Sequence, residues 1–222
     1  MAKRHCANIE WGMDMALALL GILGALAVGV VSPGPSFVLI ARISAALSRR
    51  DGLAASLGMG AGGVAFCTLA LVGLHALLAR IGWLYLGIKV AGGLYLVYLA
   101  FGLWRGAARP LEVPAGAAGG AGLWASFLLG LGTQLSNPKT AVVYGSIFAA
   151  LLPPEVPAWM FATLPPLVFV LEAGWYSAVA LAFSTGHPRN AYLRSKAWID
   201  RAAGTLMGAL GLKLVAESAQ PG

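Results

Sequence analysis

Six apolar stretches, each long enough to cross a lipid bilayer as a helix, follow one another along the chain. A helix rises about 1.5 Å per residue, so about 20 residues cross roughly 30 Å of hydrocarbon. The stretches are residues 15–47, 53–79, 82–103, 123–151, 158–183 and 199–217. This pattern predicts an all-α integral membrane protein with six transmembrane helices.

Two of these stretches contain a proline break well inside the apolar run, at Pro33-Gly34-Pro35 and at Asn137-Pro138. Proline has no N–H and disfavours helix in the residue before it, so each site interrupts a helix within the bilayer. The breaks match at an offset of 104 positions, which aligns Ser32 with Ser136. A plain proline kink in each helix is the alternative, but the matched pair favours a duplicated unit.

The predicted duplication divides the chain into two repeats of three helices each. Because three is an odd number, the second copy enters the membrane from the opposite side, and the repeats are inverted. The first helix of each repeat is the broken one. The divisions are a polar, irregular segment 1–14, a first repeat 15–103, a linker loop 104–122, a second repeat 123–217 and a tail 218–222.

Composition supports a membrane protein and excludes several other classes. Charged residues make up 10% of the chain, against about 25% in ordinary soluble domains. The net charge is +7, but the basic residues are not clustered as a nucleic-acid footprint requires. The two cysteines, Cys6 and Cys67, are far apart and fit neither a disulfide framework nor a metal site. We therefore expect no nucleic acid, no metal and no cofactor.

Basic residues also predict the orientation of the chain in the membrane. They are concentrated in the connections between spans one and two, three and four, and five and six. Cytoplasmic loops carry the excess of Lys and Arg, so both termini are predicted to be periplasmic or extracellular. Lys3 and Arg4 at the N-terminus run against this trend.

The two breaks are the first candidate binding site. Interrupted backbone cannot face lipid, so it must line a cavity enclosed by protein. The half-helices beginning near Pro35 and Pro138 would present N–H groups and a positive dipole end to an anion. The candidate substrate-binding residues are Pro33, Gly34, Pro35, Ser36, Asn137, Pro138, Lys139 and Thr140.

Lys139 follows directly after Pro138, at a helix N-terminus where a cation is disfavoured. A substrate carboxylate between the dipole end and the ammonium would satisfy both groups. The alternatives are that Lys139 extends to the membrane interface or pairs permanently with a protein carboxylate.

Two further charges lie inside predicted spans. Glu172 is in the middle of the fifth span, where a carboxylate costs several kcal/mol unless it is protonated or paired. It is a candidate for proton coupling or for receiving a substrate ammonium, with a static ion pair between helices as the alternative. Lys89 in the third span is expected to face the bundle interior or to extend to the interface. Gly58 and Gly62 form a Gly-x-x-x-Gly face for close helix packing.

Four ordered motifs resemble those of the LysE/RhtB-type amino-acid exporters. They are Pro33-Gly34-Pro35, Arg49-Arg50-Asp51-Gly52-Leu53-Ala54-Ala55-Ser56-Leu57-Gly58, the lysine-led aromatic segment Lys89-Val90-Ala91-Gly92-Gly93-Leu94-Tyr95-Leu96-Val97-Tyr98-Leu99, and Asn137-Pro138-Lys139. The resemblance covers residues 15–217. It implies a bacterial inner-membrane exporter of amino acids or close derivatives, driven by the proton motive force, and it allows a homodimer.

The leading hypothesis is thus a secondary transporter that works by alternating access, surrounded by membrane lipid and exchanging protons. A metal-ion or other small-ion transporter or channel is the alternative, and it would require rings of oxygen or soft ligands within the bilayer. A membrane-embedded enzyme would require a convergent catalytic group set. The sequence contains no recognisable catalytic motif, so we expect no enzyme.

Overall fold

The computed structural model describes residues 2–80, 82–108, 122–153, 156–184 and 186–218. Within these ranges all regular secondary structure is α-helical, as the apolar pattern predicts, and no strand occurs. The helices are α1 (Ala2–Val31), α2 (Pro35–Ala46), α3 (Arg49–Arg80), α4 (Gly82–Gly106), α5 (Gly122–Leu135), α6 (Pro138–Leu151), α7 (Ala158–Phe183) and α8 (Gly186–Ser218).

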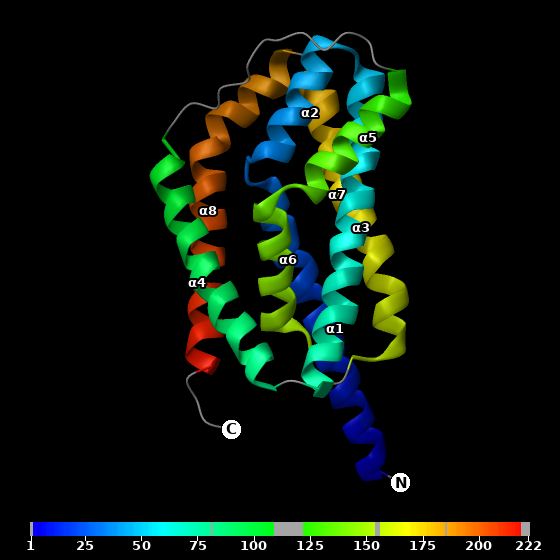
Figure 1. Ribbon diagram of the computed structural model, residues 1–222, viewed down its shortest axis with the longest axis vertical. Helices are drawn as coiled ribbons and strands as arrows, with labels where there is room; N and C mark the ends of the chain where they lie inside the picture. Colours follow the sequence, from blue (N-terminus) through cyan, green and yellow to red (C-terminus); the bar gives the residue numbers. More distant parts are fainter. Residues whose placement is uncertain (1, 81, 109–121, 154–155, 185, 219–222) are drawn as a thin grey trace.

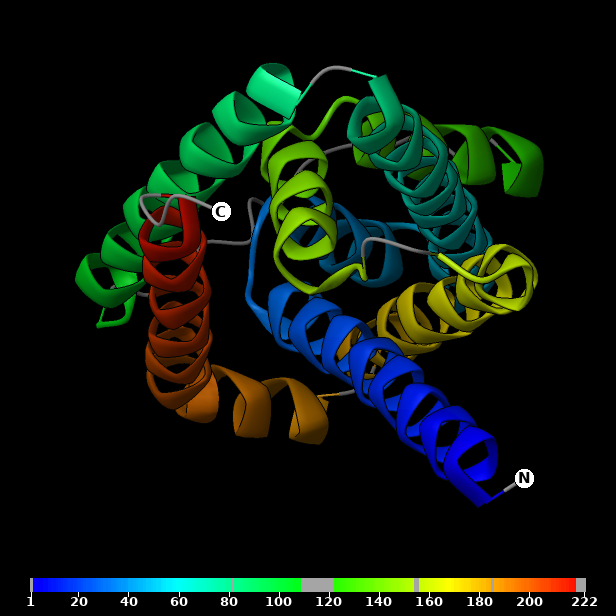
Figure 2. The ribbon, with the colours of Figure 1, turned by 90° about the horizontal axis from the view of Figure 1, so that it is seen from below.

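The helices extend further than the apolar stretches at two places. Residues 2–14, predicted to be irregular, are the first turns of α1 and project beyond the rest of the bundle (Figures 1 and 2). Helix α8 begins at Gly186 rather than near residue 199. The prediction for residues 2–14 was wrong, because polar residues without an interrupting break can continue a helix. The predicted span 199–217 lies inside α8, and the helix extends before it for the same reason.

Both predicted breaks are present. Helix α2 begins at Pro35 after Gly34, and α6 begins at Pro138 after Asn137. The axes of α1 and α2 differ in direction by 56°. The two broken pairs run in opposite directions, since the chain rises through α1 and α2 and descends through α5 and α6 (Figure 1).

Not every predicted span meets a strict test of length and composition in the described residues. Two helices are long and apolar enough to cross a membrane, in Arg49–Gly73 and Ala158–Phe183. The bent pair formed by Met15–Val31 and Pro35–Ala46 is a third span if it is counted as one. The arrangement of six spans in two inverted repeats therefore stays a prediction.

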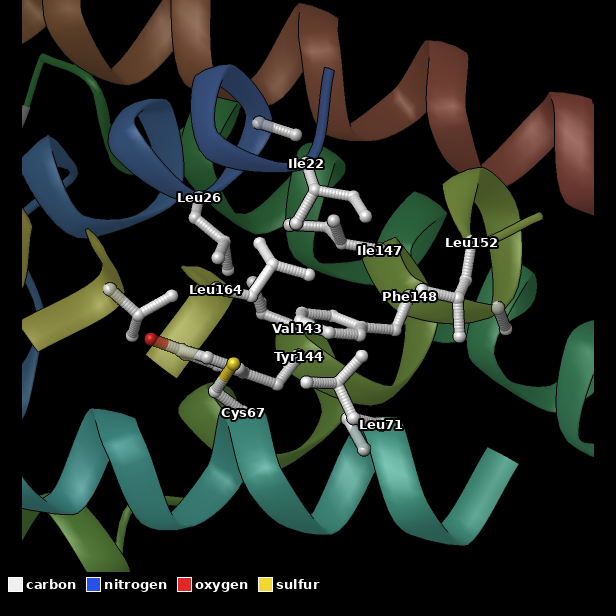
Figure 3. Close-up of a cluster of buried hydrophobic side chains, with 14 of the residues drawn as sticks. Ile22, Leu26, Cys67, Leu71, Val143, Tyr144, Ile147, Phe148, Leu152 and Leu164 are labelled. Carbon is white, nitrogen blue, oxygen red and sulfur yellow. The ribbon is translucent and has the colours of Figure 1, made fainter. Parts of the chain in front are cut away.

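Helix α6 lies in the middle of the bundle when the molecule is viewed along its length (Figure 2). Its aromatic residues Tyr144 and Phe148 are buried against Ile22 of α1 and Leu71 of α3 (Figure 3). Around this centre, α3 packs on α5 and on α7, and α4 packs on α8. Helix α6, the second part of the α5–α6 pair, is thus surrounded by the longer helices α1, α3, α4 and α8.

Small residues permit the closest of these contacts. A Cβ atom added at Gly58 would lie 2.1 Å from the carbonyl oxygen of Phe127, and one at Gly62 would lie 2.7 Å from the Gln134 side chain. Both neighbours belong to α5. The Gly58–Gly62 face predicted for helix packing is confirmed, and it brings α3 directly against α5.

Candidate functional site

The two helix breaks lie next to each other although they are far apart in the sequence. Asn137 donates a hydrogen bond from Nδ2 to Ser36 Oγ at 3.1 Å. Lys139 donates from Nζ to the carbonyl oxygen of Ser32 at 3.3 Å. These bonds connect the start of α6 with the end of α1 and the start of α2, so the breaks face a common space.

That space is a small cavity of about 30 Å³, lined by both polar and apolar residues. Since one water needs roughly 10–15 Å³ by the same kind of measure, the cavity in this closed arrangement has room for about two waters. Six of the candidate residues line it: Gly34, Ser36, Asn137, Lys139, Thr140 and Glu172. The structure therefore brings the first-half break, the second-half break and the acid of α7 together.

Lys139 reaches this cavity from the first turn of α6. Its backbone N–H donates to the side-chain oxygen of Asn137, which caps the helix at 3.0 Å. This N–H is therefore not available to a substrate, contrary to the simple dipole argument, and the ammonium group becomes the principal donor. Among the described residues, no ion pair holds Lys139. The permanent protein ion pair considered for Lys139 is thus not seen.

Glu172 is completely buried, with 0% exposure, half-way along α7. Its Oε1 accepts from the Tyr144 hydroxyl at 2.8 Å, and its Oε2 accepts from Gln134 Nε2 at 2.9 Å. Gly63 of α3 leaves room for the carboxyl group, because a Cβ there would lie 2.9 Å from Glu172 Cγ. Neutral donors hold the carboxylate, and no static ion pair of Glu172 occurs among the described residues.

Several residues that line the cavity were not predicted. Gln134 is buried in α5, and Tyr144 is buried in α6. Ser32 is also buried at the cavity, and its Oγ has no hydrogen-bond partner. Gln134 carried a usable signal, because an amide inside an apolar stretch must find partners. Tyr144 carried none, since tyrosine is common in membrane helices.

Lys89 is not part of this site. Its side chain is 16% exposed and forms an ion pair with Glu217 Oε2 at 3.3 Å. This contact links α4 to the last turns of α8, away from the cavity lining. That Lys89 is an intramembrane charge stays a prediction.

A second, more open hollow lies on the other side of Asn137. Its volume is about 410 Å³, within the range of roughly 300–1,000 Å³ typical of ligand pockets. Pro35 and Pro138 line this hollow rather than the closed cavity, together with Ser136 and one face of α5. Asn137 lines both spaces.

Comparison with known proteins gives the context of this geometry. A sequence model of the LysE type translocators matches residues 27–218, which includes both breaks and all the polar cavity residues named above. The chain belongs to the LysE type translocator family. As a LysE type translocator it is a transport protein and not an enzyme.

Individual relatives agree with this assignment. The LysE type translocator described here is 33% identical over 190 residues to the threonine efflux protein of Escherichia coli strain K12, covering 85% of this chain and 92% of that protein. It is 33% identical over 194 residues to the threonine efflux protein of Salmonella typhi, with the same coverage. It is 29% identical over 217 residues to the uncharacterized membrane protein YahN of Escherichia coli, covering 96% of each chain. No solved structure matches it significantly.

Proposed function

We propose that this translocator exports amino acids, with threonine or a similar hydroxylated amino acid as its substrate. One observation carries the proposal: Lys139 and Glu172 line the same cavity with opposite charges and form no ion pair with each other. An α-amino acid carries a carboxylate and an ammonium on one carbon atom. It would satisfy both side chains at once, with the carboxylate at Lys139 and the ammonium at Glu172.

Ser32 supports a substrate with a polar side chain. Its buried hydroxyl lies at the cavity without a hydrogen-bond partner, and such a group costs about 1–3 kcal/mol. A substrate hydroxyl would supply the missing partner. The names of the relatives from Escherichia coli and Salmonella typhi, which are threonine efflux proteins, point to the same substrate class.

Transport by this site requires the protein to open, because a cavity for about two waters cannot hold an amino acid. We infer an alternating-access cycle in which one repeat rocks against the other around the two breaks. The opposite directions of the α1–α2 and α5–α6 pairs are what inverted repeats would require (Figure 1). Glu172 would exchange a proton when the substrate leaves, which couples export to the proton motive force.

We place the protein in the bacterial inner membrane. Large apolar side chains are exposed on the outside of the bundle, among them Leu69, Tyr98 and Val170. Contiguous exposed apolar surface is rare in soluble monomers, and lipid would cover it here.

Self-association into a homodimer stays a prediction. The described residues hold no group of three or more metal-ligating side chains.

The test is efflux from proteoliposomes preloaded with radiolabelled threonine, with and without an imposed proton gradient. We expect gradient-dependent threonine efflux by the native protein. Lys139→Met and Glu172→Gln each remove a charge-assisted contact, so we expect a loss of roughly 10–100-fold in efflux. Lys89→Met is the matched control, since it removes a lysine of the same chain that lies outside the cavity.

Size-exclusion chromatography would establish that each variant is folded. Native efflux rates in both cavity variants would remove the proposed roles of Lys139 and Glu172. Absence of gradient-dependent efflux for threonine and for every other amino acid tried, in the native protein, would contradict the function itself.

A further inference from the structure

A continuous chain of hydrogen bonds joins the two helix breaks to the acid of α7. Asn137 Nδ2 donates to Ser36 Oγ at 3.1 Å, and Ser36 Oγ donates to Gln134 Oε1 at 2.7 Å. Gln134 Nε2 then donates to Glu172 Oε2 at 2.9 Å. Tyr144 supplies the second donor to Glu172 from the other side. The chain thus crosses from α6 through α2 and α5 to α7.

All of these bonds point the same way. Each donor faces toward Glu172, and the last acceptor is the carboxylate itself. Gln134 is 1% exposed, so bulk water does not replace a bond that it loses. Its amide has one donating and one accepting end. Its Oε1 accepts from Ser36 and its Nε2 donates to Glu172, so Gln134 links the two.

The first bond of the chain lies in the wall between the two hollows. Asn137 lines both the closed cavity and the open hollow. Its bond to Ser36 holds the start of α6 against the start of α2. Separating these two helix ends would open the closed cavity toward a space of about 410 Å³, which is large enough for an amino acid.

We propose that Gln134 couples occupancy of Glu172 to the opening of this wall. The inference rests on the proposed function, because it takes the substrate ammonium as the group that reaches Glu172. An ammonium displaces the neutral amide from Oε2, since a hydrogen bond between two opposite charges is stronger than one from a neutral donor to the same carboxylate. Gln134 then turns away, Ser36 loses its acceptor, and the Asn137–Ser36 contact separates. Gln134 is a positioning residue in this scheme, and substrate binding itself belongs to Lys139 and Glu172.

The experiment removes, one at a time, the two side chains that form the middle hydrogen bond, Ser36 and Gln134. Gln134→Met keeps an unbranched side chain of similar length without the amide, and Ser36→Ala removes the hydroxyl that Gln134 accepts from. For Gln134→Met we expect threonine binding and downhill threonine exchange within about threefold of the native protein, since the charged pair is intact. For both variants we expect gradient-driven export to fall by about tenfold or more, because the wall no longer responds to occupancy.

Export by a double variant distinguishes action through one series of hydrogen bonds from two independent structural roles. If both residues act through one chain, Gln134→Met combined with Ser36→Ala exports no worse than either single variant. Should Gln134→Met fail to fold, Gln134→Asn, which keeps the amide but shortens the side chain by one methylene, tests the same separation of binding from export.

Ser126→Ala is the matched control on the same helix. Ser126 is also buried, and it donates to Asp51 Oδ1 of α3 at 3.0 Å, outside the chain to Glu172. We expect native binding and native export in this variant. Native export in both Gln134→Met and Ser36→Ala would overturn the proposal, as would a parallel loss of binding and export in Gln134→Met. An absence of amino-acid export by the native protein would instead refute the proposed function, on which the coupling depends.

Discussion

Glu172 illustrates how a carboxylate is accommodated inside a helical bundle without a cation. Its two oxygens accept from Tyr144 and Gln134, and Gly63 gives the carboxyl group space beside α3. Hydrogen bonds to a charged group contribute about 1.5–3 kcal/mol each, which offsets part of the cost of burial. Among the described residues, no cation forms an ion pair with Glu172. The carboxylate is therefore available to the substrate ammonium that we propose.

This account predicts the effect of Tyr144→Phe. The substitution removes the donor to Glu172 Oε1 but keeps the ring that packs against Phe66 and Phe148. We expect the melting temperature of the purified protein to fall by roughly 3–12 °C, since one charge-assisted hydrogen bond is lost. Tyr98→Phe is the control, because Tyr98 is 69% exposed. Equal melting temperatures for Tyr144→Phe and the native protein would show that this bond does not stabilise the fold.

At the scale of the helices, α3 organises the site because its glycines let two neighbours approach. Gly58 and Gly62 contact α5, and Gly63 contacts Glu172 of α7. Helix α3 therefore sets the distance between Gln134 on α5 and Glu172 on α7. This distance allows the hydrogen bond between the two side chains. Small residues at helix contacts are the usual means of close approach between membrane helices.

Two glycine substitutions on α3 test this role. In Gly58→Ala the new Cβ would lie 2.1 Å from the backbone oxygen of Phe127, which cannot move without shifting α5. We expect a loss of about 1–3 kcal/mol in stability from overpacking, measured by thermal unfolding in detergent. Gly73→Ala meets no atom within 4 Å, so we expect no loss and a gain of up to about 1 kcal/mol from helix propensity. Similar losses in both variants would indicate that tight α3–α5 packing is not the cause.

At the scale of the whole molecule, the two broken helix pairs run in opposite directions and meet at one cavity (Figure 1). Each break would be an unsatisfied length of backbone in lipid by itself. Together they line one cavity, at which Ser36 and Asn137 bond to each other. The two breaks therefore supply both the cavity and a contact in its wall.

Orientation in the membrane is a prediction at this same scale. The basic connections imply cytoplasmic loops between spans one and two, three and four, and five and six. Alkaline phosphatase fused to the C-terminus is thus expected to be active, whereas the same enzyme inserted in the 104–122 connection is expected to be inactive. The opposite result for both fusions would reverse the predicted topology, and activity of both would contradict the odd number of spans, three, that is predicted between these two points.

The sequence alone was sufficient for features that depend on local chemistry. Helix breaks at Pro33–Pro35 and Asn137–Pro138 follow from the missing proline N–H, and they occur where the prediction placed them. The membership in a translocator family follows from ordered motifs and is confirmed. The helical structure of residues 2–14 was missed because polar residues do not by themselves end a helix.

Only the tertiary structure decided which polar side chains meet. Lys139 and Lys89 are both lysines within apolar stretches, yet one lines the cavity and the other pairs with Glu217. Gln134 and Glu172 are 38 positions apart and bond to each other because α3 holds α5 and α7 together. The face that a helix turns toward its neighbours depends on packing between distant segments, and an almost uniformly apolar helix does not reveal that face in its sequence.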